Sequence, residues 1–283
     1  MADILEWAGP NDRYRDYCLW DYEPLVPTAG KLKQSSVLWN AFDALAAPPR
    51  LRAMVEALRG ELGPFETVWG VKRIGDRFSW ELYFYDYERL DRQVSIERVL
   101  GILAPFAPSG IKLSPLRPYF MFSLDLSAEM AGIDEISVYM GNPGSSVSSG
   151  ICYNLSANGL RLDNLYYFFD AKEQWDDVVN KVAASAHLDL RGLPIESILW
   201  PELRDCGVIV VANKRFGDGV YFSRITIDQL LFFVDRLDYP QAIRQFLHEN
   251  RTRLDHLLYD VGIDYRQTEG GIEITKSAYY GVV

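Results

Sequence analysis

The sequence predicts an α+β fold, an antiparallel ten-stranded β-barrel of repeated αββα units with an outer ring of helices. A turn, a strand and a helix recur in that order at Gly75, Asn158 and Gly217, and the last turn, at Gly270, is followed by a strand alone. Such self-similarity indicates one supersecondary unit used several times. The strands group into hairpins with helices between most of them, which favours a layer of helices on one face of the sheet.

The N-terminal part of the chain, 1–66, is expected to be a helical segment that packs on the barrel. Apolar periodicity places two helices within 36–62, and Pro48 and Pro49 separate them because proline breaks a helix. A chain of 283 residues with 48% hydrophobic residues can bury a large core. We therefore expect a single domain over 1–283.

Five antiparallel hairpins follow from turn residues between strand-forming runs. They pair 67–74 with 78–87, 119–126 with 135–141, 150–155 with 160–169, 207–214 with 220–226, and 261–266 with 271–283. Helices are expected over 89–103, 172–186, 228–237 and 239–258, with Asp170 as the N-cap of the second. A closed barrel of ten strands encloses more space than its own side chains fill, so its lumen is expected to be a ligand site.

Alternation along the strands assigns their two faces. One face of 78–87 is the apolar set Phe78, Trp80, Leu82 and Phe84, which suits packing under helices, and the other is Ser79, Glu81, Tyr83 and Tyr85. Asn164, Tyr166 and Phe168 continue this second face, as do Lys276, Ala278 and Tyr280. Such a face is too polar for a dry core and suits a wet or ligand-filled interior. The alternative, an open sheet whose polar face meets solvent, stays open at this point.

Charge and hydropathy exclude several functional classes. The formal net charge of −10 and the pI near 4.9 disfavour a nucleic-acid binder and a membrane-surface protein, because both need clustered Lys and Arg. No apolar run approaches the roughly 20 residues that span a bilayer, and the N-terminus lacks a basic stretch followed by an apolar run. We therefore expect a cytoplasmic protein.

Neither the cysteines nor the histidines have metal-ligand spacing. Cys18, Cys152 and Cys206 are expected to be buried small hydrophobes in a reducing compartment. His187, His248 and His256 are expected at surface or capping positions. The stretch DDVVN, 176–180, has a faint likeness to an acidic metal motif, but Asp is favoured in the first turn of a helix by the helix dipole. No metal site is expected.

Three stretches resemble the ABBA-type aromatic prenyltransferases, a family that includes the cyanobactin peptide prenyltransferases. They are FSWELYFYDY with Glu81, NLYYFFDAKEQ with Asn164 and Tyr166, and ITKSAYYGVV with Lys276. The likeness covers about 67–283. It implies a prenyltransferase barrel and the transfer of a dimethylallyl or geranyl group from an allylic diphosphate to an aromatic small molecule or a peptide side chain. Two departures stand out: only GNPGSSVSSG links the second and third hairpins, and EISVYMG offers Ser137 and Tyr139 where the family has a basic residue.

The chemistry that this resemblance implies assigns roles to residues. The leaving diphosphate needs converging cations and amide donors, and the candidates are Lys276, Arg224, Asn164, and Lys72 or Arg73. Lys214 and Arg215 are interpreted as solvated hairpin charges. Glu81 is expected to be the base, with a pKa raised by aromatic neighbours, or else to form a buried ion pair with Arg73. Tyr83, Tyr139, Tyr166, Tyr221 and Tyr280 are expected to shield an allyl cation or bind the acceptor.

Two other functions remain open on the sequence alone. One is a non-catalytic barrel that binds a hydrophobic or peptide ligand, for which the shortage of inward cations is the main support. The other is an open α+β scaffold whose tyrosine-rich face docks a protein partner. A Mg-independent or weakly Mg-dependent transferase is the first hypothesis, so no cofactor beyond Mg²⁺ with the diphosphate is expected. The oligomeric state stays open.

Overall fold

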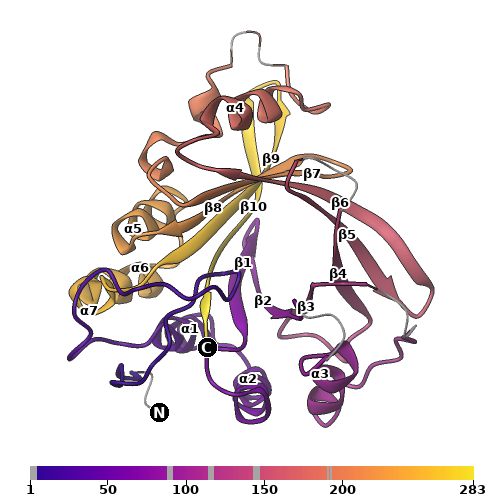
Figure 1. The fold of residues 1–283 in the computed structure, drawn as a ribbon, viewed down its shortest axis with the longest axis vertical. Helices are drawn as coiled ribbons and strands as arrows, with labels where there is room; N and C mark the ends of the chain where they lie inside the picture. The colour runs from indigo at the N-terminus through magenta and orange to yellow at the C-terminus, as the bar shows by residue number, and fades with distance from the viewer. Residues whose placement is uncertain (1–4, 88–91, 114–117, 143–146, 190, 192) are drawn as a thin grey trace.

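The ten expected strands form and close into one antiparallel barrel. The computed structural model of the protein describes residues 5–87, 92–113, 118–142, 147–189, 191 and 193–283 (Figure 1). Around the barrel the strand order is β1-β10-β9-β8-β7-β6-β5-β4-β3-β2, and β2 pairs with β1 to complete the circle. The predicted fold class is therefore confirmed. Closure rules out the open scaffold with a solvent-facing sheet.

The strands lie close to their predicted positions. They are β1 Val68–Ile74, β2 Arg77–Tyr85, β3 Met121–Leu126, β4 Glu135–Gly141, β5 Ser149–Ser156, β6 Gly159–Asp170, β7 Val208–Asn213, β8 Asp218–Ile225, β9 Tyr259–Thr268 and β10 Gly271–Val282. Tight hairpin turns set their register. Gly75 and Gly159 have φ values of 58° and 107°, which only glycine adopts without strain.

Helices lie at the periphery of the strands (Figure 1). They are α1 Ser35–Ala44, α2 Pro49–Leu62, α3 Ile96–Leu103, α4 Trp175–Ala183, α5 Ile227–Arg236, α6 Gln241–Glu249 and α7 Arg251–Leu254, with short 3-10 turns at Ile195–Ser197 and Pro201–Leu203. The break between α1 and α2 falls at the two prolines, as predicted. The outward strand residues Trp80, Leu82 and Phe84 are buried in the core shared with the helices, which confirms the assignment of the two faces.

Three helix boundaries differ from the prediction for local reasons. Asp170 ends β6 instead of capping a helix, because its Oδ1 accepts the backbone N–H groups of Lys172 and Glu173 and forms a separate turn before α4. The helix expected over 239–258 begins after Pro240 and divides at Asn250 into α6 and α7. The helix expected over 89–103 begins at Ile96, behind the Ser95 cap, and 88–91 lie outside the described residues.

The N-terminal segment is helical only in its second half. Residues 5–34 form an irregular segment with isolated bridges between Trp7 and Leu32 and between Arg15 and Asp21. Pro10, Pro24 and Pro27 interrupt any helical pattern there. This segment passes over one end of the barrel. It therefore contributes side chains to the barrel interior although it lies outside the repeated αββα units.

Candidate functional site: a polar cavity inside the barrel

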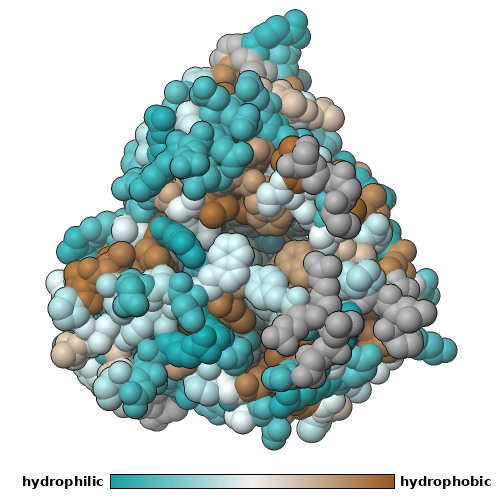
Figure 2. Space-filling model, in the orientation of Figure 1, coloured by the Kyte–Doolittle hydropathy of each residue, from teal (hydrophilic) through white to brown (hydrophobic). Residues whose placement is uncertain are grey.

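The barrel encloses a cavity of about 1210 Å³ to which every strand contributes. Figure 2, in the orientation of Figure 1, shows this face of the molecule hollowed near its middle. A cavity of this size exceeds the range of about 300–1,000 Å³ that holds a single drug-sized ligand. One wall residue from each strand, β1 to β10, is Lys72, Glu81, Ser123, Tyr139, Asn154, Asn164, Val210, Tyr221, Asp264 and Lys276.

Glu81 stands at the centre of a buried network. Its Oε1 accepts a hydrogen bond from Lys276 Nζ at 2.9 Å, and Lys72 Nζ lies 3.2 Å from the same oxygen. Its Oε2 accepts the hydroxyl groups of Tyr83 at 2.9 Å and Tyr280 at 3.1 Å. All four partners come from the three adjacent strands β10, β1 and β2, where Gly70 lies beside both Glu81 and Tyr280 in the register. The fold therefore brings Glu81 and Lys276 together, and of the two alternatives Lys72 and Arg73 it places Lys72 beside them.

The ionisation of Glu81 differs from the expectation. Burial alone would raise the pKa of the Glu81 carboxyl, but the ammonium groups of Lys276 and Lys72 outweigh burial and hold that pKa well below its ordinary value. Arg73 does not form the alternative ion pair, because it lies on the outer face of β1, and Glu81 pairs with the two lysines instead. Without a bound ligand, Glu81 is an ionised carboxylate and a weak base.

A second charged group lies on the wall formed by β7, β8 and β9. Lys214 Nζ donates to both oxygens of Asp264, at 2.8 and 2.7 Å, and to the hydroxyl of Tyr221 at 2.9 Å. The Lys214 side chain is only 17% exposed. The interpretation of Lys214 as a solvated hairpin charge is therefore wrong: it follows directly after β7, and its long side chain reaches back along the wall into the lumen.

Five tyrosines form a belt along the inner wall, and a sixth caps it. Ring centroids along the belt are 5.8 to 6.4 Å apart, within the range of favourable aromatic pairing. Tyr17, from the N-terminal segment, lies 5.0 Å from Tyr83 and 5.1 Å from Tyr280. In order along the wall the belt is Tyr221, Tyr166, Tyr139, Tyr83 and Tyr280. All five were expected to face the lumen, whereas Tyr17 was not.

Two predicted diphosphate ligands do not line the cavity. Arg73 lies on the outer face of β1, where it donates to the backbone carbonyls of Leu237 and Asp238, because strand alternation turns it away from its inward neighbour Lys72. Arg224 occupies a bulge in β8 with a φ of 61°, and its Nε donates to Asp16 Oδ2 at 2.7 Å. The bulge interrupts the alternation that the sequence pattern assumed.

Asn164 and the residues of β4 do line the cavity. The side-chain amide of Asn164 donates to Asp163 Oδ2 at 2.7 Å and to the Tyr166 hydroxyl at 3.3 Å. Ser137 and Tyr139 also reach the lumen. The amide and the hydroxyl groups are therefore available on the wall opposite the lysines of β1 and β10.

Sequence reasoning missed the acidic character of the cavity. Closure of the barrel brings these groups onto one wall, whereas acidic residues near hairpin ends normally face solvent. Asp125, Asp134, Glu135 and Asp170 remain exposed there. Among the described residues, the carboxylates outnumber the cations two to one. The acidic wall residues are Asp16, Glu81, Asp125, Asp134, Glu135, Asp163, Asp170, Asp218, Asp260 and Asp264, and the basic ones are Lys72, Arg161, Lys214, Arg215 and Lys276.

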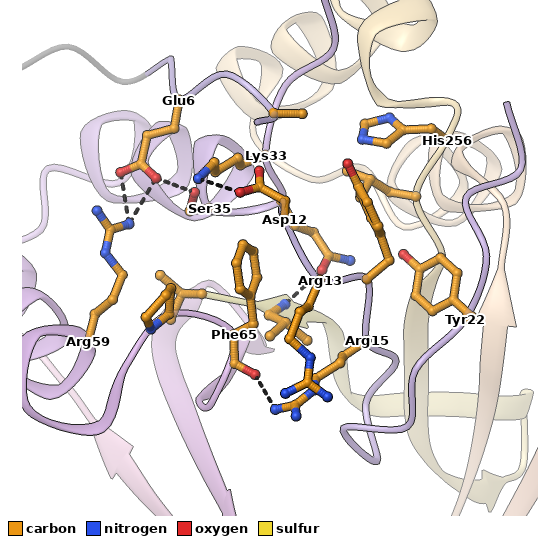
Figure 3. A pocket seen from close by; sticks show the side chains of 17 residues that line it. Glu6, Asp12, Arg13, Arg15, Tyr22, Lys33, Ser35, Arg59, Phe65 and His256 are labelled. Carbon is orange, nitrogen blue, oxygen red and sulfur yellow. Dashed lines mark hydrogen bonds and ion pairs between the residues drawn. The ribbon is translucent and has the colours of Figure 1, made fainter. Parts of the chain in front are cut away.

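A smaller cavity of about 120 Å³ lies outside the barrel, beneath the N-terminal segment (Figure 3). Its cations are already paired: Arg59 Nη1 lies 2.8 Å from Glu6 Oε2, and Lys33 Nζ lies 3.2 Å from Asp12 Oδ1. The pair of Glu6 with Arg59 fastens the segment to α2, and the pair of Asp12 with Lys33 joins two parts of the segment itself. The cavity therefore anchors the segment that carries Tyr17 and offers no unpaired arginine or lysine among the labelled residues of Figure 3.

His256 borders the same small cavity and is fully buried, so its predicted surface position is wrong. It packs edge-on against Tyr14, with ring centroids 5.6 Å apart, because the N-terminal segment covers it. His248 is exposed beside Asp235, as expected. Cys152 and Cys206 are buried, also as expected, whereas Cys18 lines the barrel cavity.

Within the described ranges, no cluster of three or more His, Cys, Asp or Glu residues has the arrangement of a metal site. Asp176 and Asp177 lie in the first turn of α4. None of the helices in the described part of the chain is long and apolar enough to cross a membrane.

The comparisons with known proteins give a similarity in structure but none in sequence. No family model matches the chain, and no curated protein matches it. Among solved structures, the crystal structure of AnaPT from Neosartorya fischeri is similar with a TM-score of 0.45 and 11% identity, over 76% of this chain and 77% of that one. The chain has the closed ten-stranded barrel with outer helices that the resemblance to ABBA-type prenyltransferases implied. The similarity to AnaPT assigns no substrate to it.

Proposed function

We propose that this barrel transfers a prenyl group, of the dimethylallyl or geranyl class, from an allylic diphosphate to an aromatic small molecule or a peptide side chain. The observation that carries the proposal is the tyrosine belt beside buried ammonium groups, in a cavity of about 1210 Å³ with room for a donor and an acceptor. A reaction through an allyl cation needs this combination: cations for the leaving group, π-faces for the carbocation and exclusion of water.

In this proposal the diphosphate binds Lys72, Lys276 and Lys214, with the amide of Asn164 as a further donor. Each of the three ammonium groups is now paired with a carboxylate of the cavity. A diphosphate carries more negative charge than one carboxylate and offers more acceptor oxygens, so it competes for the same ammonium groups. Whether Mg²⁺ assists is tested by adding a chelator.

Diphosphate binding also changes the basicity of Glu81. The lysines hold its pKa low, and their engagement by the diphosphate leaves the carboxylate buried with fewer cationic partners. Burial then raises the pKa of Glu81. In this proposal the carboxylate becomes a competent base after the donor has bound, and it accepts the proton that the acceptor loses.

The test is incubation with dimethylallyl or geranyl diphosphate and a panel of phenols, indoles and Tyr or Trp peptides, followed by mass spectrometry. A mass gain of one prenyl group is expected in at least one acceptor, and Lys276→Met should remove it. Lys172→Met is the matched control, because the Lys172 side chain is 77% exposed on the outside of the barrel. Transfer that survives Lys276→Met, or no transfer to any acceptor, would contradict the proposal.

A second candidate function is a non-catalytic barrel that binds a hydrophobic or peptide ligand. The excess of carboxylates on the cavity wall favours it, because carboxylates repel a diphosphate. Thermal denaturation with inorganic diphosphate separates the two candidates. A rise in the midpoint supports a diphosphate site, whereas no rise at millimolar concentration supports the non-catalytic barrel.

A further inference from the structure

The end of the barrel beneath the N-terminal segment holds two buried oxygen atoms that lack hydrogen-bond partners. Asp260 lies on β9 with an exposed fraction of 6% and lines the cavity. Its carboxyl group is hydrogen-bonded by Ser223 and by the backbone of Tyr17 and Arg224, but its Oδ1 has no hydrogen bond. The hydroxyl of Tyr85, on the wall at the same end, also has none. A buried polar atom without a partner costs roughly 1–3 kcal/mol, so two at one end of a ligand-sized cavity indicate that a ligand satisfies them.

The charged groups around Asp260 indicate that the ligand is positively charged. Arg224 is the nearby cation, but its Nε donates to Asp16 Oδ2 at 2.7 Å. Asp16 further accepts the backbone N–H groups of Cys18 and Trp20, which holds it in place. Among the ion pairs of the described residues, none involves Asp260. One carboxylate at this end therefore lacks a counter-ion.

Aromatic rings surround Asp260 at this end of the cavity. Tyr17, Trp20, Tyr85 and Tyr87 all line the wall there, and Tyr85 and Tyr87 stack with ring centroids 5.4 Å apart. Aromatic faces attract organic cations, and a carboxylate among them fixes the position of the charge.

We infer that the prenyl acceptor is an aromatic molecule carrying a protonated amine, and that Asp260 binds this ammonium group. The Tyr85 hydroxyl oxygen accepts a second hydrogen bond from the same ammonium group. The role of this ligand as a prenyl acceptor rests on the proposed function, but the binding of an aryl amine at Asp260 does not depend on catalysis. The two charged ends then divide the cavity: the lysines of β1 and β10 face the anionic donor, and Asp260 faces the cationic acceptor.

The titration of Asp260 supports this assignment. Burial, and to a lesser degree the Asp16 carboxylate, raise the pKa of Asp260 to about 7. The charged or titratable groups near it are Asp16, Arg224, Cys18, Tyr22, Tyr85 and Cys206. A bound ammonium favours the ionised carboxylate, so binding near pH 7 must release a proton from Asp260, on the order of half a proton for each ligand.

The experiment measures binding by calorimetry with tyramine, an aryl amine, and with tyrosol, its neutral alcohol analogue. Tyramine should bind more tightly than tyrosol, and Asp260→Asn should weaken tyramine by about tenfold or more while changing tyrosol by less than about twofold. Titrations of tyramine in buffers of different ionisation enthalpy should show proton release, which Asp260→Asn removes. Asp134→Asn, a wall carboxylate at the opposite end of the barrel, is the matched control.

Three results would overturn the inference: equal affinity for tyramine and tyrosol, tyramine binding that Asp260→Asn leaves unchanged, or no tyramine binding at millimolar concentration. Tyr85→Phe keeps the ring and removes only the hydroxyl, so it serves if Asp260→Asn does not fold, and it should weaken tyramine selectively. Asp260-dependent tyramine binding without any prenyl transfer would refute the proposed function and leave this site standing. Prenyl transfer without Asp260-dependent tyramine binding would support the proposed function and refute the amine site.

Discussion

The ring of Tyr221 lies flat against Gly262 of the neighbouring strand, so that a Cβ at residue 262 would stand 2.1 Å from its Cδ1. Gly70 has the same relationship with Tyr280, at 2.6 Å. Glycine is needed at both positions for close approach and not for its backbone angles. The two glycines let the tyrosine rings lie along the wall, which keeps the lumen open for a ligand.

Gly262→Ala should displace Tyr221 and separate its hydroxyl from Lys214 and Asp264. Overpacking of this kind costs about 1–3 kcal/mol of the free energy of unfolding. Chemical denaturation measures the loss, and Gly101→Ala is the control, since a Cβ there meets nothing within 4 Å. In a helix that change should stabilise by about 0.5–1 kcal/mol. Equal effects of the two substitutions would show that Tyr221 is not held against Gly262.

Glu81→Gln should reduce the stability of the fold as well as activity. The substitution leaves Lys276 buried without its carboxylate partner, and breaking a buried pair costs about 3–5 kcal/mol. Adding Lys276→Met should recover part of this loss, which a double-mutant cycle in denaturant detects. Glu56→Gln, which breaks an exposed pair with Arg52, should change stability by less than about 1 kcal/mol. A Glu81→Gln protein as stable as Glu56→Gln would contradict the buried network.

Tyr17→Leu should raise the share of prenyl diphosphate that is lost to water. Tyr17 caps the belt by its edge contacts with Tyr83 and Tyr280, so its removal admits water to the allyl cation. The ratio of free prenol to prenylated acceptor, read by mass spectrometry, should rise severalfold. Tyr167→Leu on the outer face, where the ring contacts Lys181, should leave the ratio unchanged. A ratio that moves equally in both variants would assign Tyr17 a packing role only.

The hairpins and the inward face followed from the sequence because each depends on local chemistry. Glycine turns such as that at Gly75 define strand ends, and the period of two then fixes which side chains enter the lumen. Glu81 and Lys276 were placed correctly for this reason, whereas the choice between Lys72 and Arg73 stayed open. Because Arg73 and Lys72 are neighbours in the sequence, strand alternation places only one of them in the lumen. The inward face of β1 determines which one it is.

The remaining site residues depend on features that alternation does not encode. Arg224 sits at a bulge, whose extra residue shifts the register of β8 without a distinctive sequence signal. Tyr17 comes from an irregular segment that belongs to no repeat. The low pKa of Glu81 arises from two lysines on other strands, so only the closed barrel reveals it. Asp260 follows Tyr259 in an ordinary strand pattern, and its missing partner is a property of packing.

His256 should make the protein lose stability as the pH falls from 6.5 to about 4. Burial, assisted by the Lys31 ammonium, lowers the pKa of His256 from 6.5 to about 4, so in this range the unfolded chain binds a proton that the folded chain does not. The free energy of unfolding therefore rises with pH across this interval. Asp260 acts in the opposite direction, because its pKa is raised in the fold, and the total slope mixes both contributions.

Comparison with His256→Phe isolates the histidine contribution. Phenylalanine keeps the edge contact with Tyr14 and removes two ring nitrogens that have no hydrogen-bond partner, so stability at pH 7 should be retained or increased. The difference in unfolding free energy between wild type and variant, measured in urea at several pH values, should change steadily between pH 4 and 6.5 and be constant above it. A pH-independent difference for His256→Phe would mean that the imidazole has the same pKa in the folded and the unfolded chain, which would contradict the prediction.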